Sequence, residues 1–285
     1  VIDNYVTGSS KNLAGLEKTG KLKLIEADIE NADYSKLPAM DIVYDLASPA
    51  SPVLFDKIPI NILRSNSSGL FKLLEYFRNS RSKVFVFAST SEVYGDPLVS
   101  PQHEGYYGNV NSFGPRACYD EGKRFAEAVI YSYINTYKLD LRVARIFNTY
   151  GPNMSKDDGR FISNFVNQAI NNSPLTVYGD GMQSRSCCYV TDMVEGLKLL
   201  GTIPQLGGKV INIGNPDERK IIEVANLVNK LIGKSTKITY LPVGKDDPKR
   251  RCPDITLARK ILGFEPKIKL EDGLKKTIEY FKKLQ

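Results

Sequence analysis

Residues 83–92 read Lys83-Val84-Phe85-Val86-Phe87-Ala88-Ser89-Thr90-Ser91-Glu92, an apolar run followed by four polar side chains. The run is short and rich in β-branched and aromatic residues, which predicts a parallel strand buried on both faces. In open α/β sheets, ligands bind beyond the carboxyl ends of the strands. We therefore expect an α/β fold in which the four polar residues lie at the ligand-binding edge of a parallel sheet.

Strand and helix patterns alternate on both sides of this stretch, through the first 150 residues. Apolar runs predict strands at 22–27, 42–46, 84–88 and 141–147. Apolar residues at helical spacing predict two long helices, at 58–78 and 118–137. This order is typical of a Rossmann-like, doubly wound parallel sheet. We expect this sheet domain to span residues 1–150.

Residues 151–285 show shorter elements and predict a smaller C-terminal, substrate-binding domain, with the chain crossing back to the sheet. A short strand is expected at 176–178 because it ends in Gly179-Asp180-Gly181. Amphipathic patterns predict helices at 221–232, 255–262 and 270–281.

Tyr119 and Lys123 are four residues apart in a predicted helix, so their side chains leave the same face. A nearby cation lowers the pKa of a phenol from its ordinary value of about 10. The Tyr119 phenolate would then take a hydroxyl proton while hydride leaves the same carbon. An isolated Tyr-x-x-x-Lys pair is usually two amphipathic side chains on a helix surface. Its position after the strand at 84–88 favours redox chemistry instead.

The bulk composition is that of an ordinary globular protein, with 42% apolar and 25% charged residues among 285. No uncharged apolar run approaches the ~18 residues that span a bilayer, so we expect no membrane segment. The basic residues that give a formal charge of +7 are spread out, which argues against nucleic acid and suits a phosphate-bearing small ligand. A single histidine, His103, argues against a zinc site. The four cysteines lack Cys-x-x-Cys spacing, which indicates a reducing compartment.

Four blocks of sequence carry a family resemblance. They are Leu-Ala-Ser-Pro-Ala-Ser-Pro at 46–52, Ala-Ser-Thr-Ser-Glu-Val-Tyr-Gly-Asp-Pro at 88–97, Gly-Pro-Arg-Ala-Cys-Tyr-Asp-Glu-Gly-Lys-Arg at 114–124, and Arg-Val-Ala-Arg-Ile-Phe-Asn-Thr-Tyr-Gly-Pro at 142–152. In this order, the blocks resemble the extended short-chain dehydrogenase/reductases that act on nucleotide sugars. Within that family the likeness is nearest to the UDP-glucuronate decarboxylases, and it runs from Val1 to about Tyr280.

The resemblance implies NAD-dependent conversion of UDP-glucuronate to UDP-xylose: oxidation at carbon 4, loss of carbon dioxide from the β-keto acid, and re-reduction. Two alternatives stay open, a dTDP-glucose 4,6-dehydratase-like or other nucleotide-sugar dehydrogenase and a non-catalytic UDP-sugar-binding protein. Dehydratases typically place Asp-Glu after the catalytic threonine, whereas this chain has Ser91-Glu92. A serine hydroxyl is a poor acid for expelling hydroxide. Epimerases usually lack the carboxylate of Glu92, so decarboxylation is preferred.

The resemblance also implies roles for the catalytic residues. Tyr119 is the base for the 4-hydroxyl, Lys123 lowers its pKa, and Thr90 orients the 4-oxygen. Ser91 and Glu92 position the carboxylate-bearing ring or a water. Repulsion from a substrate carboxylate is expected to raise the pKa of Glu92.

By the same resemblance, Arg251 matches a family arginine that reaches the active site and completes the catalytic set. A fixed guanidinium can hold a carboxylate or diphosphate bidentately. The substrate-binding residues implied by the resemblance are Arg64, Asn148, Arg160, Thr176, Tyr178, Gln183, Arg185 and Arg251. Gln183 and Arg185 would clamp the diphosphate, and Tyr178 would lie near uracil. Phe55 stands where relatives often carry a tyrosine, so one contact with a substrate hydroxyl is lost.

The cofactor implied by the resemblance is NAD. Its binding residues would be Asp3, Asn4, Thr7, Gly8, Asp28, Ile29, Leu46, Ala47, Ser48, Asn66, Ala88, Ser89, Tyr119 and Lys123. Asp3 favours NAD over NADP, because its charge would repel a 2′-phosphate.

The chain opens at Val1-Ile2-Asp3-Asn4, which reads as the end of a second strand. A dinucleotide fold begins with a strand and a glycine-rich turn that holds the pyrophosphate. Both are missing from the sequence, so we expect about 30 further residues upstream. A native protein without that turn would fit the non-catalytic alternative. The resemblance finally implies a homodimer joined through the two long helices and a cytoplasmic location, although some relatives lie in a secretory lumen behind an N-terminal anchor.

Overall fold

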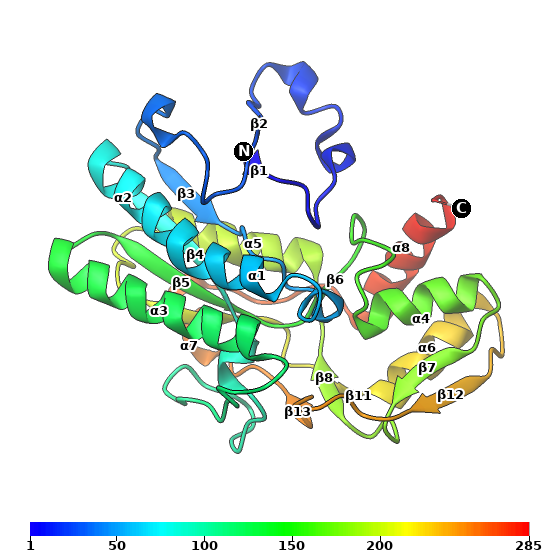
Figure 1. Cartoon of the computed structure of the whole chain (residues 1–285). Coiled ribbons are helices and arrows are strands. Elements are labelled where there is room, and N and C mark those ends of the chain that lie inside the picture. Colours follow the sequence, from blue (N-terminus) through cyan, green and yellow to red (C-terminus); the bar gives the residue numbers. More distant parts are fainter. Residues whose placement is uncertain (285) are drawn as a thin grey trace.

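The computed structural model describes residues 1–284, and its main sheet is parallel throughout. Within that range the sheet has four strands, in the order β10 (Val210–Ile213), β5 (Leu141–Ile146), β4 (Val84–Thr90) and β3 (Ile42–Asp45). A second parallel pair consists of β1 (Ile2–Asp3) and β2 (Ile25–Glu26), drawn in blue in Figure 1. The expected Rossmann-like α/β class is confirmed.

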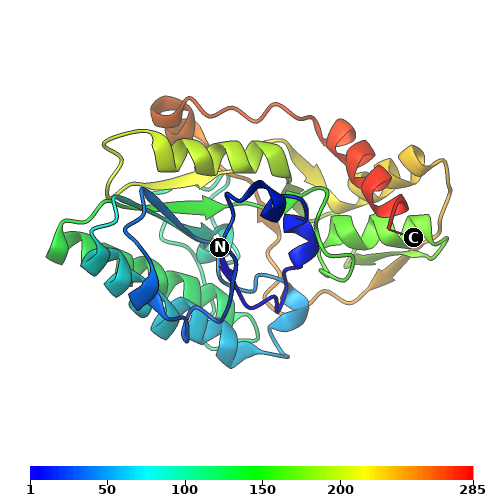
Figure 2. The same ribbon diagram turned by 90° about the horizontal axis from the view of Figure 1, so that it is seen from above.

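Helices cover both faces of the sheet, as the apolar strand at 84–88 requires. Phe85 and Phe87 of β4 pack under α2 (Leu70–Ser80) and α3 (Ala117–Tyr137). Val86 points to the other face, where α5 (Val190–Thr202) and α7 (Thr256–Leu262) lie. Successive side chains of a strand alternate between faces, so one strand serves both cores. Figure 2 shows the sheet between the two helical layers.

The helix predicted at 58–78 is interrupted. It consists of α1 (Pro59–Arg64), a π-helical turn at Ser65–Gly69, and α2. In the turn, Asn66 Nδ2 donates to the Ile62 carbonyl and to Ser48 Oγ, both at 2.8 Å. The π-turn thus fixes the loop that follows β3, and π-turns inside helices are often found at functional sites.

A second core lies in the C-terminal part of the chain (Figure 1). The helices α4 (Phe161–Ile170), α6 (Ile221–Ile232) and α8 (Leu270–Lys282) pack around β7 (Leu175–Tyr178), which pairs with β12 (Ile238–Leu241). The short strands here are β6 (Thr149–Tyr150), β8 (Ser184–Ser186), β9 (Cys188–Tyr189), β11 (Glu218–Lys220) and β13 (Arg250–Arg251).

Sequence reasoning located α6, α7 and α8 but missed α4, α5 and β10. β10 pairs with β5 and so belongs to the main sheet, although it follows the C-terminal strands β7 to β9 along the chain. The division into domains at residue 150 stays a prediction. Over residues 1–284, the helices are too short or too polar to cross a membrane.

Candidate active site

A cavity of about 670 Å³ lies at the carboxyl ends of β3, β4 and β5, between the sheet and the C-terminal core. It brings together residues that are distant in the sequence. The predicted site residues that line it are Leu46, Ser48, Ala88, Ser89, Thr90, Ser91, Glu92, Tyr119, Lys123, Asn148, Arg160, Thr176, Tyr178, Gln183 and Arg185.

Other predicted residues lie outside this cavity. Asp3 ends β1, and its carboxylate accepts a hydrogen bond from the Tyr5 N–H at 2.7 Å. Asn4 donates to Asp28 at 2.9 Å. Thr7 lines a smaller cavity of about 370 Å³ that shares Ser48 and Arg160 with the first.

Four more of the predicted binding residues also lie outside the cavity. Arg64 is exposed at the end of α1. Asn66 is buried behind Ser48. Ile29 is buried against Gly69, where a Cβ would lie 2.8 Å from the Ile29 Cγ1 atom. The Ala47 N–H donates to the Asp45 carboxylate, which fixes the turn after β3.

Tyr119 is buried and stacks on Phe55, with ring centroids 5.2 Å apart and an interplanar angle of 18°. Burial raises the pKa of Tyr119 to about 12; the Thr90 hydroxyl opposes this shift and the charge of Glu92 adds to it. Tyr119 is therefore a neutral phenol at pH 7. The prediction of a lowered tyrosine pKa is wrong, because burial outweighs the Thr90 hydroxyl and the charge of Arg160.

Lys123 is also buried. Its Nζ donates to the Ala88 carbonyl at 2.7 Å and lies 5.9 Å from the centroid of the Tyr119 ring. Burial lowers the pKa of Lys123 to about 8, against the opposing charges of Asp45 and Glu127. One donor of the ammonium group is thus engaged with the backbone at the end of β4, and an ammonium group has three.

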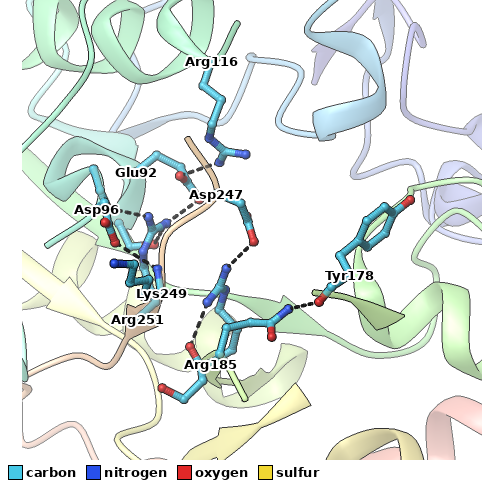
Figure 3. Close-up of polar contacts among 12 residues, drawn as sticks. Glu92, Asp96, Arg116, Tyr178, Arg185, Asp247, Lys249 and Arg251 are labelled. Carbon is cyan, nitrogen blue, oxygen red and sulfur yellow. Dashed lines mark hydrogen bonds and ion pairs between the residues drawn. The ribbon is translucent and has the colours of Figure 1, made fainter. Parts of the chain in front are cut away.

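Glu92 lies between two guanidinium groups (Figure 3). Its Oε2 is 2.6 Å from Nη2 of Arg116, and its Oε1 pairs with Nη1 of Arg251. Burial would raise the pKa of Glu92, but Arg251 and Arg116 outweigh it and hold the pKa well below its usual range. The expected rise of the Glu92 pKa beside a substrate carboxylate stays a prediction. Glu92 is a fixed carboxylate.

Arg251 is fully buried and supports the active-site turn from behind. Besides Glu92, it donates to Ser91 Oγ at 3.3 Å and to the Gly95 carbonyl at 3.0 Å. The sequence placed Arg251 against the substrate, whereas its described contacts are with the residues that follow β4. Its charge fixes the position of Ser91 and Glu92.

Sequence reasoning missed Arg116 and Asp120 as site residues. Arg116 lines the cavity, and its Nε lies 3.5 Å from Oδ2 of Asp120. Burial and the charge of Glu92 raise the pKa of Asp120 to about 7, with Arg116 and Arg251 opposing. Within the described residues, Asp120 Oδ1 has no hydrogen-bond partner. Both residues lie within the quoted block 114–124. Their closeness to Tyr119 in the sequence could therefore have indicated that they belong to the site.

The far side of the cavity presents polar groups from the C-terminal part. Arg185 pairs with Asp247 at 3.0 Å, and Arg160 pairs with Asp158 at 2.8 Å. Gln183 Nε2 donates to the Tyr178 carbonyl at 2.6 Å. Two arginines thus line the same cavity as Thr90 and Tyr119, which suits a ligand with anionic groups.

The predicted cofactor residues fit a dinucleotide. Beside the Asp3 carboxylate, Gly8 leaves room that a Cβ would fill, because that atom would lie 3.1 Å from Oδ2. A carboxylate at a strand end is suited to ribose hydroxyls. Ser48 and Lys123 offer a hydroxyl and an ammonium in the cavity itself. These groups could hold the two riboses.

Comparison with known proteins places the chain in a class. Residues 2–214 match the model of the NAD dependent epimerase/dehydratase family, so the chain belongs to this family. The chain is 45% identical over 283 residues to UDP-glucuronic acid decarboxylase 1 of Xenopus tropicalis, a match that covers 99% of the chain. The chain spans 66% of the length of that relative. The resemblance inferred from the four sequence blocks is confirmed.

Two further comparisons agree with this family assignment. UDP-glucuronic acid decarboxylase 6 of Arabidopsis thaliana is 45% identical over 282 residues, which are 99% of this chain and 80% of that protein. Among solved structures, UDP-glucuronic acid 4-epimerase from Bacillus cereus in complex with UDP-glucuronic acid and NAD superposes with a TM-score of 0.91. It is 27% identical, and the match covers 100% of this chain and 90% of that one.

Proposed function

We propose that this chain catalyses the NAD-dependent decarboxylation of UDP-glucuronate to UDP-xylose. The observation that carries the proposal is that Thr90, Ser91, Glu92, Tyr119 and Lys123 line one cavity together with Arg185. The identity of 45% with two proteins named UDP-glucuronic acid decarboxylase supports the choice of reaction.

The cofactor would be NAD, held by Asp3, Asn4, Asp28, Ser48 and Lys123. NAD when bound supplies a hydride acceptor and donor at carbon 4. Loss of the 4-hydroxyl proton and hydride leaves a ketone β to the carboxylate. The bond from carbon 5 to the carboxylate then breaks, its electron pair is stored as the enolate, and a proton adds to carbon 5. Return of a hydride and a proton at carbon 4 completes the reaction.

Tyr119 is the group that exchanges the proton of the 4-hydroxyl. Since Tyr119 is a neutral phenol at pH 7, it must lose its proton before it can act as a base. The Thr90 hydroxyl and the charge of Arg160 both favour this loss. Thr90 also accepts a hydrogen bond from the Glu92 N–H at 3.2 Å, which fixes its hydroxyl at the end of β4.

The residue at position 91 argues against the dehydratase alternative. Dehydration needs an acid that protonates the departing hydroxide, and Ser91, which lines the cavity beside Glu92, is a poor acid. Glu92 cannot supply that proton either, because Arg116 and Arg251 hold it ionised. Decarboxylation needs no such acid. We propose that Ser91 and Glu92 position the carboxylate-bearing ring or a water.

Product analysis tests the proposal. Incubation with NAD and UDP-glucuronate should give UDP-xylose and carbon dioxide without net accumulation of NADH, detected by mass spectrometry and absorbance at 340 nm. dTDP-glucose serves as the control substrate. A 6-deoxy-4-keto product from dTDP-glucose would favour the dehydratase alternative, and binding of UDP-sugars without turnover would favour the non-catalytic one.

We also propose a homodimer and a cytoplasmic location. The long helices α1, α2 and α3 carry exposed apolar side chains, among them Ile60, Phe71 and Phe125. The rings of Phe71 and Phe125 lie 6.3 Å apart, so they form one apolar patch on adjacent helices. Free cysteines at four positions suit a reducing compartment.

A further inference from the structure

A strap of eight residues, 242–249, joins β12 to β13 and crosses the edge of the cavity. Its members Gly244, Lys245, Asp247 and Pro248 line the cavity together with Arg185. The strap is therefore the segment between the C-terminal strands that a ligand in the cavity would contact.

Asp247 of this strap holds the guanidinium of Arg185. Asp247 Oδ2 lies 3.0 Å from Nη2 of Arg185, and Figure 3 shows the carboxylate pointing at that group. The Arg185 side chain is 10% exposed, while that of Asp247 is 32% exposed. The arginine is fixed inside the wall, and its partner is the more accessible member of the pair.

The strap does not depend on this ion pair for its position. Asp246 accepts a hydrogen bond from Asn111 Nδ2 at 2.9 Å. The Lys249 N–H donates to Asp96 at 2.9 Å, and the Lys249 carbonyl accepts from the Ser184 N–H at 3.0 Å. Contacts on both sides of Asp247 thus anchor the strap, and the Asp247 carboxylate can leave Arg185 without releasing the loop.

Arg185 needs an anion beside it. Burial, with Arg251 and Arg116 nearby, lowers the pKa of Arg185, and Asp247 and then Glu92 oppose that shift. A buried cation without a partner is strongly destabilising. Arg185 is also the residue expected to clamp the diphosphate under the proposed function. Nη2 of Arg185 donates to Asp247 and Nη1 donates to the Ser184 carbonyl at 2.9 Å, so a phosphate in bidentate contact with this guanidinium competes with Asp247 for it.

We propose that Asp247 is a placeholder anion that neutralises Arg185 in the free protein and yields it to the diphosphate of the incoming nucleotide sugar. Asp247 is then a specificity-determining residue, because only a ligand with a strong anionic group displaces it. A neutral sugar leaves the ion pair intact. This inference rests on the proposed function, in which the diphosphate binds Arg185. It adds that Asp247 competes with the diphosphate for this arginine.

Calorimetric binding of UDP to the full chain tests this. Removing the competitor in Asp247→Asn should tighten UDP binding up to about fivefold, the upper end of the range expected for a partly exposed ion pair. Asp246→Asn is the matched control, since Asp246 pairs with Asn111 instead of Arg185 and its backbone, at φ 63°, suits asparagine. It should bind UDP as the wild type does.

A variant that loses its fold is recognised by circular dichroism, and Asp247→Ser then replaces Asp247→Asn. Unchanged or weaker UDP binding by a folded Asp247 variant overturns the placeholder role, and weaker binding would mean that Asp247 contacts the ligand. Wild-type protein that does not bind UDP overturns the proposed function as well. Binding of UDP by the wild type with equal affinity in both variants overturns the placeholder alone.

Discussion

Two adjacent arginines show how much burial decides the role of a residue. Arg250 is exposed and pairs with Glu218, whereas Arg251 is fully buried and pairs with Glu92. Both stand in one short strand, β13, and nothing in their local sequence distinguishes them. The difference follows from alternation of side chains along the strand.

Substitution of these two glutamates should therefore have unequal effects. Glu92→Gln leaves the buried Arg251 without a charged partner and should lower the free energy of unfolding by about 3 kcal/mol. Glu218→Gln removes an exposed pair and should cost less than about 1 kcal/mol. Urea denaturation monitored by circular dichroism measures both. Equal effects would contradict the account of Arg251 as a buried support.

Asp120 predicts a pH dependence of stability. Its folded pKa of about 7 lies above the ordinary value for an aspartate, so its contribution to stability is present at low pH and is lost as pH rises through 7. The charged groups that face it are Glu92, Arg116 and Arg251, of which the arginines oppose the shift. Asp120→Asn should become more stable relative to wild type between pH 5 and pH 8.

Denaturant unfolding at the two pH values measures this difference. Glu279→Gln is the control, because Glu279 is an exposed carboxylate on α8 and its removal should change the difference little. A stability difference between Asp120→Asn and wild type that is the same at pH 5 and pH 8 would show that Asp120 does not titrate in this range.

At the scale of single residues, the sequence predicted which side chains lie together in the site but not their protonation states. Tyr119 and Lys123 share a helix face, as spacing alone requires, and both line the cavity. Their pKa values depend on burial and on charged neighbours such as Arg160 and Asp45, which are distant in the sequence. Periodicity carries no information about such tertiary contacts.

At the scale of elements, the break between α1 and α2 is the feature that local pattern hid. The apolar spacing over 58–78 is that of one continuous helix. The π-turn exists because Asn66 reaches Ser48 and because Gly69 lets Ile29 approach the helix. Both partners lie in other segments, so the interruption could not be read from 58–78 itself.

Gly69→Ala tests this packing. The new Cβ would lie 2.8 Å from Ile29 Cγ1 and 3.3 Å from the Arg64 carbonyl, so the variant should lose about 1–3 kcal/mol of unfolding free energy. Ile29→Ala removes the clashing atoms. In a double-mutant cycle by urea denaturation, the two changes together should cost less than their sum. Strict additivity would contradict the contact.

At the scale of the whole molecule, the sequence predicted the fold class better than the connections. The strands around the quoted stretch have apolar runs and were located, whereas β10 is a four-residue strand far along the chain. Its place beside β5 is set by packing with α5 and α7. The cavity lies between segments that only the complete topology brings together.

The apolar patch on the long helices predicts the oligomeric state. Phe71→Glu with Phe125→Glu places two charges on the proposed interface and should convert a dimer to a monomer, measured by sedimentation velocity. Leu98→Glu is the control, because Leu98 is exposed but lies outside these helices. A double variant that sediments as the wild type does would place any dimer contact elsewhere.

The fate of the carboxylate carbon of UDP-glucuronate distinguishes decarboxylation from epimerisation. UDP-glucuronate labelled with carbon-13 in the carboxylate, followed by NMR with wild-type protein, NAD and a Tyr119→Phe control, tests it most directly. We predict that the label leaves as carbon dioxide and bicarbonate in step with the appearance of UDP-xylose, and that Tyr119→Phe abolishes both. A label that stays on the sugar while the configuration at carbon 4 inverts would contradict decarboxylation and indicate an epimerase.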